Sequence, residues 1–352
     1  MKRFGNKKQP FELQMAGYIK SCLRWKMKTL VFLWAFLSLF SLSALDLSSY
    51  KTIVCFGDSI THGGTYHMFL QEYLAETDPS HPRRVINRGI SGSTVPALLK
   101  RVDKMLQTDK PDLVIIQIGI NDLISSTRFA EKDLPFEKAV KKYPVFKRFE
   151  KNLGDLIDIL NKAKVKVVLL GTPPYNESAN PEVTASLNPN MDTSGVRNFQ
   201  IIEKRLAKQK GAEFIDIYTP LLKNLQENDA ACPRGKRDRV HPSRQEHLII
   251  ARTIIGSSYT PGPKQKIAMQ YTQVQAEIQR VAGIYGRIPD SCKTADEQIE
   301  FYKNWVGSLK GRNFEYWNKM LPDIISILKD PETKLKTLYK KRDAAFDKLY
   351  QK

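Results

Sequence analysis

The amino-acid sequence predicts an α/β protein with a doubly wound parallel sheet, and three observations lead to this fold class. Five short runs are rich in strand-forming residues: 51–56, 83–88, 112–118, 165–170 and 212–217. The first, third and fourth runs are almost continuously apolar, as is typical of parallel strands that helices cover on both faces. Helical patterns separate the runs, and this alternation of strands and helices indicates a doubly wound sheet.

Two of the intervening helices have a clear pattern. Residues 146–163 place apolar side chains, beginning with Phe149 and Leu153, at three- and four-residue spacing, which predicts an amphipathic helix. A second helix is predicted over 197–210, and it ends at Gly211, a residue type that commonly terminates helices.

The carboxyl ends of the predicted strands are unusual, because four of the five run directly into a glycine. These glycines are Gly57, Gly89, Gly119 and Gly171. Polar residues adjoin two of them: Asp58 and Ser59 follow the first strand, and Asn121 and Asp122 follow the third. Ligands of doubly wound sheets bind outside the carboxyl ends of the strands, so these residues predict a functional site at that edge.

The loop after the last strand carries a second polar group. Ser243 and Glu246 have the S-x-x-E spacing of a capping box, which predicts a helix that begins at Arg244. His241 therefore stands at the entrance of an anchored helix, with Asp238 three residues earlier in the same loop.

These residues match the requirements of acyl transfer through a serine. A serine becomes a nucleophile when a base takes its proton and a third group orients the base, and Ser59, His241 and Asp238 provide these types. A developing oxyanion needs preorganised donors. The backbone N–H groups of Ser59 and Gly89 and the amide of Asn121 are candidates, with Gly89 a glycine so that substrate can approach its backbone.

The chain resembles the SGNH (GDSL-type) hydrolase family of esterases and lipases over about residues 51–256. Four blocks carry the resemblance: "GDSI" at 57–60, "NRGISG" at 87–92, "GIND" at 119–122 and "DRVH" at 238–241. The resemblance implies a flavodoxin-like three-layer α/β/α fold with a central parallel sheet. It also implies that Ser59 is the nucleophile, His241 the base and Asp238 the orienting acid, with Ser59, Gly89 and Asn121 as oxyanion donors.

Other residues near the site have simpler interpretations. Asp58 is expected to bond to backbone amides of its own turn, and His62 to be a pocket-wall or turn residue. Asp122 could fix the turn around Asn121 or contact substrate. Asn121 itself could cap a helix instead, since asparagine is common at that position. A metal site built from Asp58 and the "DRVH" residues would offer one histidine, whereas zinc usually has more nitrogen or sulfur ligands. No metal and no cofactor are therefore expected.

Two loops suggest the substrate class. The loops at 123–145 and 171–195 are long and rich in polar residues, and Tyr175, Asn176 and Asn188 could line a cleft for a sugar. Neither loop contains an amphipathic stretch that resembles the lid of a lipase.

The predicted function is an exported serine esterase that removes short acyl groups, above all acetyl, from a carbohydrate. The alternatives are a lipase or lysophospholipase, an O-acyltransferase of the same fold, and a non-catalytic exported binding protein. The expected partner is an acylated small molecule or glycan. Although the formal net charge is +19, the sequence shows no basic and aromatic nucleic-acid module, so no nucleic acid is expected.

The amino-terminal segment indicates export. An apolar stretch at 30–42 follows Lys26 and Lys28 and is succeeded by small residues up to Ala44, as in a secretory signal peptide that could begin at Met27. The stretch is short for a membrane span, but an uncleaved signal anchor is the alternative, and it would be the chain's contact with a membrane. Cys232 and Cys292 could pair in an oxidising compartment.

The predicted organisation has three parts: residues 1–43 as signal peptide or anchor, 45–258 as the hydrolase domain and 264–352 as a helical appendage. The Pro-Gly-Pro run within 259–263 marks the boundary between the last two parts. The appendage is expected to pack its aromatic residues against one another or against the hydrolase domain, and alternatively to cover the cleft or dock a partner. Its predicted helices are 264–284, 295–309, 313–329 and 332–350.

Overall fold

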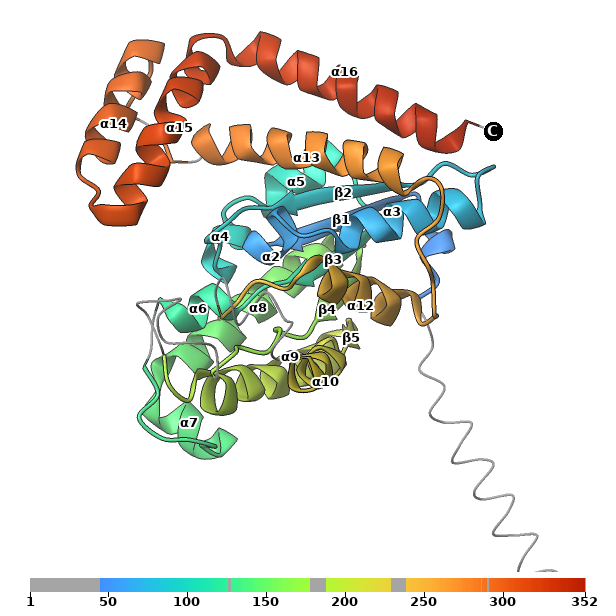
Figure 1. The fold of residues 1–352 in the computed structure, drawn as a ribbon. Coiled ribbons are helices and arrows are strands. Elements are labelled where there is room, and N and C mark those ends of the chain that lie inside the picture. Colours follow the sequence, from blue (N-terminus) through green and yellow to red (C-terminus); the bar gives the residue numbers. More distant parts are fainter. Residues whose placement is uncertain are drawn as a thin grey trace, which may run out of the picture. The chain divides into compact units, whose positions relative to one another are not determined.

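The computed structural model describes residues 45–125, 128–177, 188–228, 239–285, 287–289 and 291–351. These residues belong to one compact unit, Leu45–Lys352 (Figure 1). The predicted signal segment, Asp238 and Cys232 lie outside the described residues. Among the helices of the described ranges, none has the length and apolar character needed to cross a membrane.

A parallel sheet in the order β2-β1-β3-β4-β5 forms the centre of the unit and confirms the predicted fold class. This order is the one found in flavodoxin-like doubly wound folds. Every strand lies within one of the predicted runs or differs from it by a single residue. The strands are β1 (Thr52–Gly57), β2 (Arg84–Gly89), β3 (Leu113–Gln117), β4 (Lys166–Leu170) and β5 (Glu213–Ile215).

Helices cover both faces of the sheet and enclose two cores. Successive residues of β1 face opposite cores: Ile53 and Cys55 belong to one, and Val54 and Phe56 to the other. The first core contains residues of α3 (Tyr66–Thr77), α10 (Tyr218–Glu227) and α12 (Arg244–Ile255). The second contains residues of α4 (Val95–Leu99), α5 (Val102–Asp109), α8 (Pro144–Lys162) and α9 (Arg197–Lys210). Shorter helical elements are η1 (Leu47–Ser49), α2 (Ser59–His62), α6 (Ile120–Ile124), α7 (Phe136–Lys142) and η3 (Met191–Val196).

The predicted helix boundaries are confirmed where the sequence supplies a cap. Helix α9 ends before Gly211, whose φ of 69° is the left-handed conformation that glycine adopts readily. Helix α12 begins at Arg244 as predicted, with a complete capping box. The Ser243 hydroxyl accepts from the Glu246 N–H at 3.2 Å, and the Glu246 carboxylate accepts from the Ser243 N–H at 2.7 Å.

The carboxyl-terminal region consists of α13 (Gln265–Tyr285), α14 (Ala295–Gly307), α15 (Gly311–Lys329) and α16 (Pro331–Tyr350), as predicted. These helices enclose a third core around Tyr302, whereas Tyr316 is 59% exposed. Figure 1 shows α13 and α16 side by side along the β2 edge, and both contact α3. The predicted division of the chain at 259–263 stays a prediction.

Side chains from three helices seal the outer edge of β2. An edge strand exposes unpaired backbone groups, which proteins cover to prevent unwanted pairing. Gln275 of α13 accepts from the Asn87 N–H at 2.5 Å and donates to the Val85 carbonyl at 2.9 Å. Gln71 of α3 accepts from the Val85 N–H at 2.8 Å.

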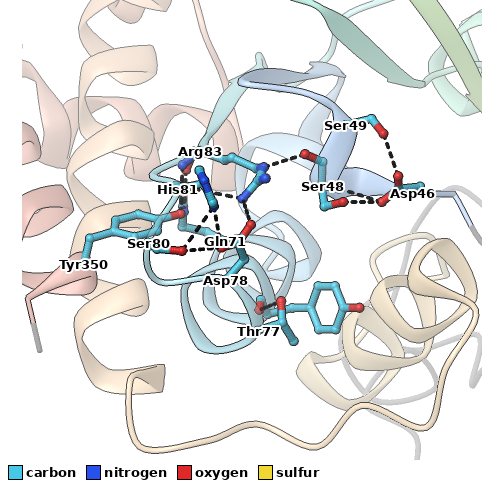
Figure 2. A network of polar contacts seen from close by, with 11 residues as sticks. Asp46, Ser48, Ser49, Gln71, Thr77, Asp78, Ser80, His81, Arg83 and Tyr350 are labelled. Atoms are coloured by element: carbon cyan, nitrogen blue, oxygen red, sulfur yellow. Dashed lines mark hydrogen bonds and ion pairs between the residues drawn. The ribbon is translucent and has the colours of Figure 1, made fainter.

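Tyr350, the last residue of α16, completes this seal, as Figure 2 shows. The Tyr350 hydroxyl accepts from the Arg83 N–H at 3.1 Å and donates to the Arg83 carbonyl at 2.9 Å. The Arg83 guanidinium in turn donates to Asp78 and to the Ser48 carbonyl, each at 2.7 Å. The carboxyl-terminal helices therefore cover the outer edge of the sheet.

Replacing Gln275 by leucine should destabilise the whole unit. The substitution leaves one backbone N–H and one carbonyl of β2 buried without partners, at about 1–3 kcal/mol for each group. Thermal unfolding should therefore begin several degrees lower. Gln273→Leu, an exposed position on the same helix, is the matched control and should unfold close to the parent. Equal melting temperatures for the two variants would contradict the edge-sealing role.

Candidate active site

The turn between β1 and α2 presents Ser59 at the carboxyl edge of the sheet. Asp58 is the N-cap of α2, and its carboxylate accepts from the Ile60 N–H at 2.9 Å, as predicted for this residue. Gly57 must be a glycine, because a Cβ there would lie 2.3 Å from the Gln117 carbonyl oxygen. Ser59 follows as the first residue of the helix and is half-buried.

His241 meets Ser59 at this edge although 182 residues separate them in the chain. The Nε2 atom of His241 lies 2.8 Å from the Ser59 hydroxyl, which is hydrogen-bond distance. The imidazole comes from the loop before α12, whose capping box holds the following residues in place. The third predicted member, Asp238, lies outside the described residues.

Asn121 adjoins the loop that follows β2. It lies in the first turn of α6, and its side-chain amide donates to the Ser93 carbonyl at 3.0 Å. An amide group has two N–H donors, so this bond leaves the second one for a ligand.

Gly89 has a different setting from the one predicted. Its N–H donates to the side-chain carbonyl of Asn87 at 2.9 Å, so this donor is already engaged. A Cβ at this position would lie 2.3 Å from the His62 nitrogen and 2.8 Å from the Asp58 carbonyl oxygen. The close packing of α2 against β2 therefore requires a glycine here.

Gly92 is a candidate that the sequence analysis missed. It occupies the third position of a turn closed by the Ser93 N–H and the Ile90 carbonyl at 3.1 Å. Its φ of 79° is the conformation that a type II turn requires there, and this explains the glycine. Gly92 is exposed, and within the described residues its N–H has no hydrogen-bond acceptor. The sequence pattern that could have identified it is the second glycine of "NRGISG".

The residues predicted to contact substrate are buried. Asp122 is 8% exposed, and its carboxylate accepts from the Val95 N–H at the start of α4. Tyr175 is 4% exposed, and its N–H donates to Asp192 at 2.8 Å. These contacts favour a role in fixing the loops after β3 and β4. Asn176 and Asn188, which were expected to line a sugar cleft, are likewise buried.

His62 connects α2 to two other segments. Its Nδ1 lies 2.9 Å from the Ser91 hydroxyl and its Nε2 lies 3.3 Å from the Ala276 carbonyl in α13. Burial lowers the pKa of His62, so the neutral ring is favoured. The histidine thus joins the serine-bearing helix to the carboxyl-terminal helices.

Two buried acids near the site have pKa values well above those of ordinary aspartates. Burial raises the pKa of Asp58 to about 7, and burial also raises that of Asp122 to about 7. Within the described residues, Oδ2 of Asp58 has no hydrogen-bond partner, which agrees with a carboxyl group that resists ionisation. The His241 side chain opposes this shift as a smaller contribution.

Replacing Asp58 by asparagine should change how stability depends on pH. In the parent, the folded state keeps a proton that the unfolded state releases, so stability falls as pH rises from about 4 to about 7. Asparagine can still cap α2 but does not titrate. The unfolding free energy of Asp58→Asn relative to the parent should therefore rise by about 1 kcal/mol per pH unit over this range and level off above it. Urea unfolding at several pH values measures this, and a constant difference would contradict the buried protonated acid.

The flavodoxin-like parallel sheet carries the Ser59–His241 pair at its carboxyl edge. Residues 55–248 match the model of the GDSL-like lipase/acylhydrolase family. An acetylxylan esterase from Geobacillus stearothermophilus is 30% identical over 229 residues, which is 60% of this chain and 95% of that protein. The chain belongs to the GDSL-like lipase/acylhydrolase family, and it is an enzyme that hydrolyses ester bonds.

A solved structure shows the same fold, and a second is similar over part of the chain. The structure of a gut microbial diltiazem-metabolizing enzyme superposes with a TM-score of 0.64 at 16% identity, covering 85% of this chain and 94% of that one. An acetyl xylan esterase structure is 24% identical with a TM-score of 0.47, covering 59% of this chain and all of that one.

Proposed function

We propose that this protein is an exported serine esterase that removes acetyl or other short acyl groups from a carbohydrate. The observation that carries the proposal is the 2.8 Å contact between Ser59 Oγ and His241 Nε2 at the edge of the sheet. Nothing in the fold requires a serine and a histidine so far apart in sequence to meet, whereas acyl transfer requires this pair.

In the proposed reaction, Ser59 Oγ attacks the ester carbonyl carbon while His241 Nε2 takes the hydroxyl proton. The tetrahedral intermediate collapses, the carbon–oxygen bond to the alcohol breaks, and His241 returns the proton to the departing oxygen. Water then attacks the acyl-serine, with His241 again accepting and returning a proton, and the carboxylic acid leaves. Asp238, three residues before the histidine, would hold the imidazole through Nδ1.

The oxyanion of each intermediate requires donors that are free before the reaction begins. The Ser59 N–H and the Asn121 amide keep the roles that the sequence suggested. We assign the third donor to the Gly92 N–H in place of Gly89, because the Gly89 N–H is engaged by Asn87 whereas Gly92 lies on the exposed turn beside Asn121.

Two further observations support the substrate class and the location. The match covers almost the full length of the acetylxylan esterase relative, which favours removal of acetyl groups from a glycan. The apolar stretch at 30–42 with its preceding lysines favours export, either as a cleaved signal peptide or as an anchor.

Rates on an acetate and an octanoate of the same phenol, together with acetate release from acetylated xylooligosaccharides, test the proposal. We expect the purified enzyme to prefer the acetate ester and to release acetate from the oligosaccharides. Preference for octanoate would instead assign a lipase or lysophospholipase. Transfer of the acyl group to an added sugar faster than to water would assign an O-acyltransferase.

A further inference from the structure

A pocket of about 240 Å³ lies between the active-site loops and the carboxyl-terminal helices. His62, Ile90 and Ser91 line it on the side of the sheet, while Gly283 of α13 and Trp317 of α15 are among the residues on the other side. This pocket is built jointly by the hydrolase fold and by the helices that extend it.

Other cavities lie elsewhere beneath α13. Two of them share Arg88, Lys104 and Tyr339 in their linings, and neither lining includes His62 or Ser91.

The pocket adjoins the proposed nucleophile. Ser59 and His62 are three residues apart in α2, a spacing that places side chains about 5–6 Å apart on one face of a helix. His62 also contacts Ser91, which directly precedes Gly92, the proposed oxyanion donor. The wall of the pocket at His62 therefore lies within one helical turn of Ser59.

The lining of the pocket suits an apolar ring. Ile90, Ile284, Met320 and Ile324 provide aliphatic surface, and Trp317 provides an aromatic one. Pockets of this composition, with a few polar groups at the wall, are typical of sites for small organic groups.

The two arginines of the lining are engaged by other side chains. Arg280 is paired through Nη2 with Glu277 and with Asp323, each at 2.6 Å, while its Nη1 is buried without a hydrogen-bond partner among the described residues. The Arg287 guanidinium lies over the rings of Trp305 and Trp317 at 5.0 and 4.9 Å from their centroids. This cation–π contact holds the Trp317 indole in place.

We propose that the pocket binds a ring of the alcohol portion of the ester, next to the bond that is cleaved. The inference rests on the proposed function. If the acyl group is acetyl, it is too small to need this space, so the alcohol portion of the ester is the part that would occupy the pocket. A cavity of about 150 Å³ already accommodates benzene, so the pocket has room for one six-membered ring with a substituent. An aromatic ring and a sugar ring both present the apolar face that this lining fits.

The test compares kcat/KM for three acetate esters: ethyl acetate, benzyl acetate and a fully acetylated methyl xyloside. The key variant is Gly283→Leu. A Cβ at Gly283 would lie 3.8 Å from Ile90 Cγ2, an ordinary contact, so the backbone tolerates a side chain and the rest of the leucine fills the pocket. Trp317→Ala removes the aromatic surface as a second variant. Phe314→Ala, an exposed aromatic outside the pocket on the same helix, is the matched control.

We expect the parent to prefer at least one ring ester over ethyl acetate, and the ratio of the two kcat/KM values to fall about tenfold or more in Gly283→Leu and Trp317→Ala. Phe314→Ala should keep the parent ratio. If the kcat/KM ratio falls for benzyl acetate, the pocket binds an aromatic ring; if it falls for the acetylated xyloside, the pocket binds a sugar ring.

Unchanged ratios in Gly283→Leu and Trp317→Ala would overturn the inference, as would a parent with no preference for either ring ester. A loss that appears instead in the ratio of ethyl octanoate to ethyl acetate would also overturn it, by assigning the pocket to the acyl group. Failure of the proposed function is a separate result, because the parent would then hydrolyse ethyl acetate no faster than Ser59→Ala.

Discussion

Replacing Ser59 by alanine should lower kcat for acetate esters by roughly 10⁴- to 10⁶-fold while the protein stays folded. Alanine removes the oxygen that forms the acyl-serine, and His241 then has no hydroxyl to deprotonate. Ser59 occupies the first position of α2, where alanine is compatible with the helix and the Asp58 cap stays in place. Steady-state kinetics measure the loss of kcat, and thermal unfolding shows that the variant stays folded.

The control for Ser59→Ala is Ser258→Ala, at an exposed serine after α12. It should retain the parent rate. Because a serine nucleophile and its base act as a unit, the proposal predicts that His241→Ala costs nearly as much as Ser59→Ala, and the double variant little more than either. Substantial activity in Ser59→Ala would remove the acyl-serine mechanism.

Replacing Asn121 by alanine should lower kcat by about 10²- to 10³-fold with a much smaller change in KM. In the proposed mechanism the amide donates to charge that develops in the transition state, so its loss should affect the chemical step more than binding. Asn121→Asp preserves the shape of the side chain but places negative charge beside the oxyanion, and it should be at least as damaging.

A purely structural role for Asn121 makes a different prediction. The amide also donates to the Ser93 carbonyl, so alanine costs about 1 kcal/mol of stability in addition. If Asn121→Ala lowered the melting temperature but left kcat unchanged, the residue would be a loop anchor only. Asn228→Ala, an exposed asparagine after α10, controls for the substitution itself.

The sequence was sufficient for the sheet and most helices because those elements follow local rules. Apolar runs located the strands, and the Ser243–Glu246 capping box located the start of α12 to the residue. Ser59 was expected at the carboxyl edge because it follows a parallel strand. His241 follows α10 and not a strand, so its meeting with Ser59 was expected from the family resemblance.

The choice between Gly89 and Gly92 could not be made from the sequence. Both are glycines in one short block, and their roles differ because Asn87 captures one N–H and a turn exposes the other. Burial of Asp122 and Tyr175 was equally hidden, because polar residues in a loop carry no pattern that distinguishes an internal bond from a contact with substrate.

The contacts made by the carboxyl-terminal helices also could not be predicted from the sequence. Their helical periodicity was visible, but the insertion of Gln275 into the edge of β2 depends on a contact between residues 188 positions apart. The pocket beside His62 likewise arises from the packing of segments that no local pattern connects.

Covalent labelling with a fluorophosphonate tests the central claim most directly, since these reagents modify a serine only when a neighbouring base activates it. Peptide mass analysis of the labelled parent should place a single phosphonyl group on Ser59. An acetylated xylooligosaccharide should slow the labelling, and His241→Ala should lose it. An esterase that is active yet unlabelled at Ser59, or that is labelled equally in His241→Ala, would contradict the account.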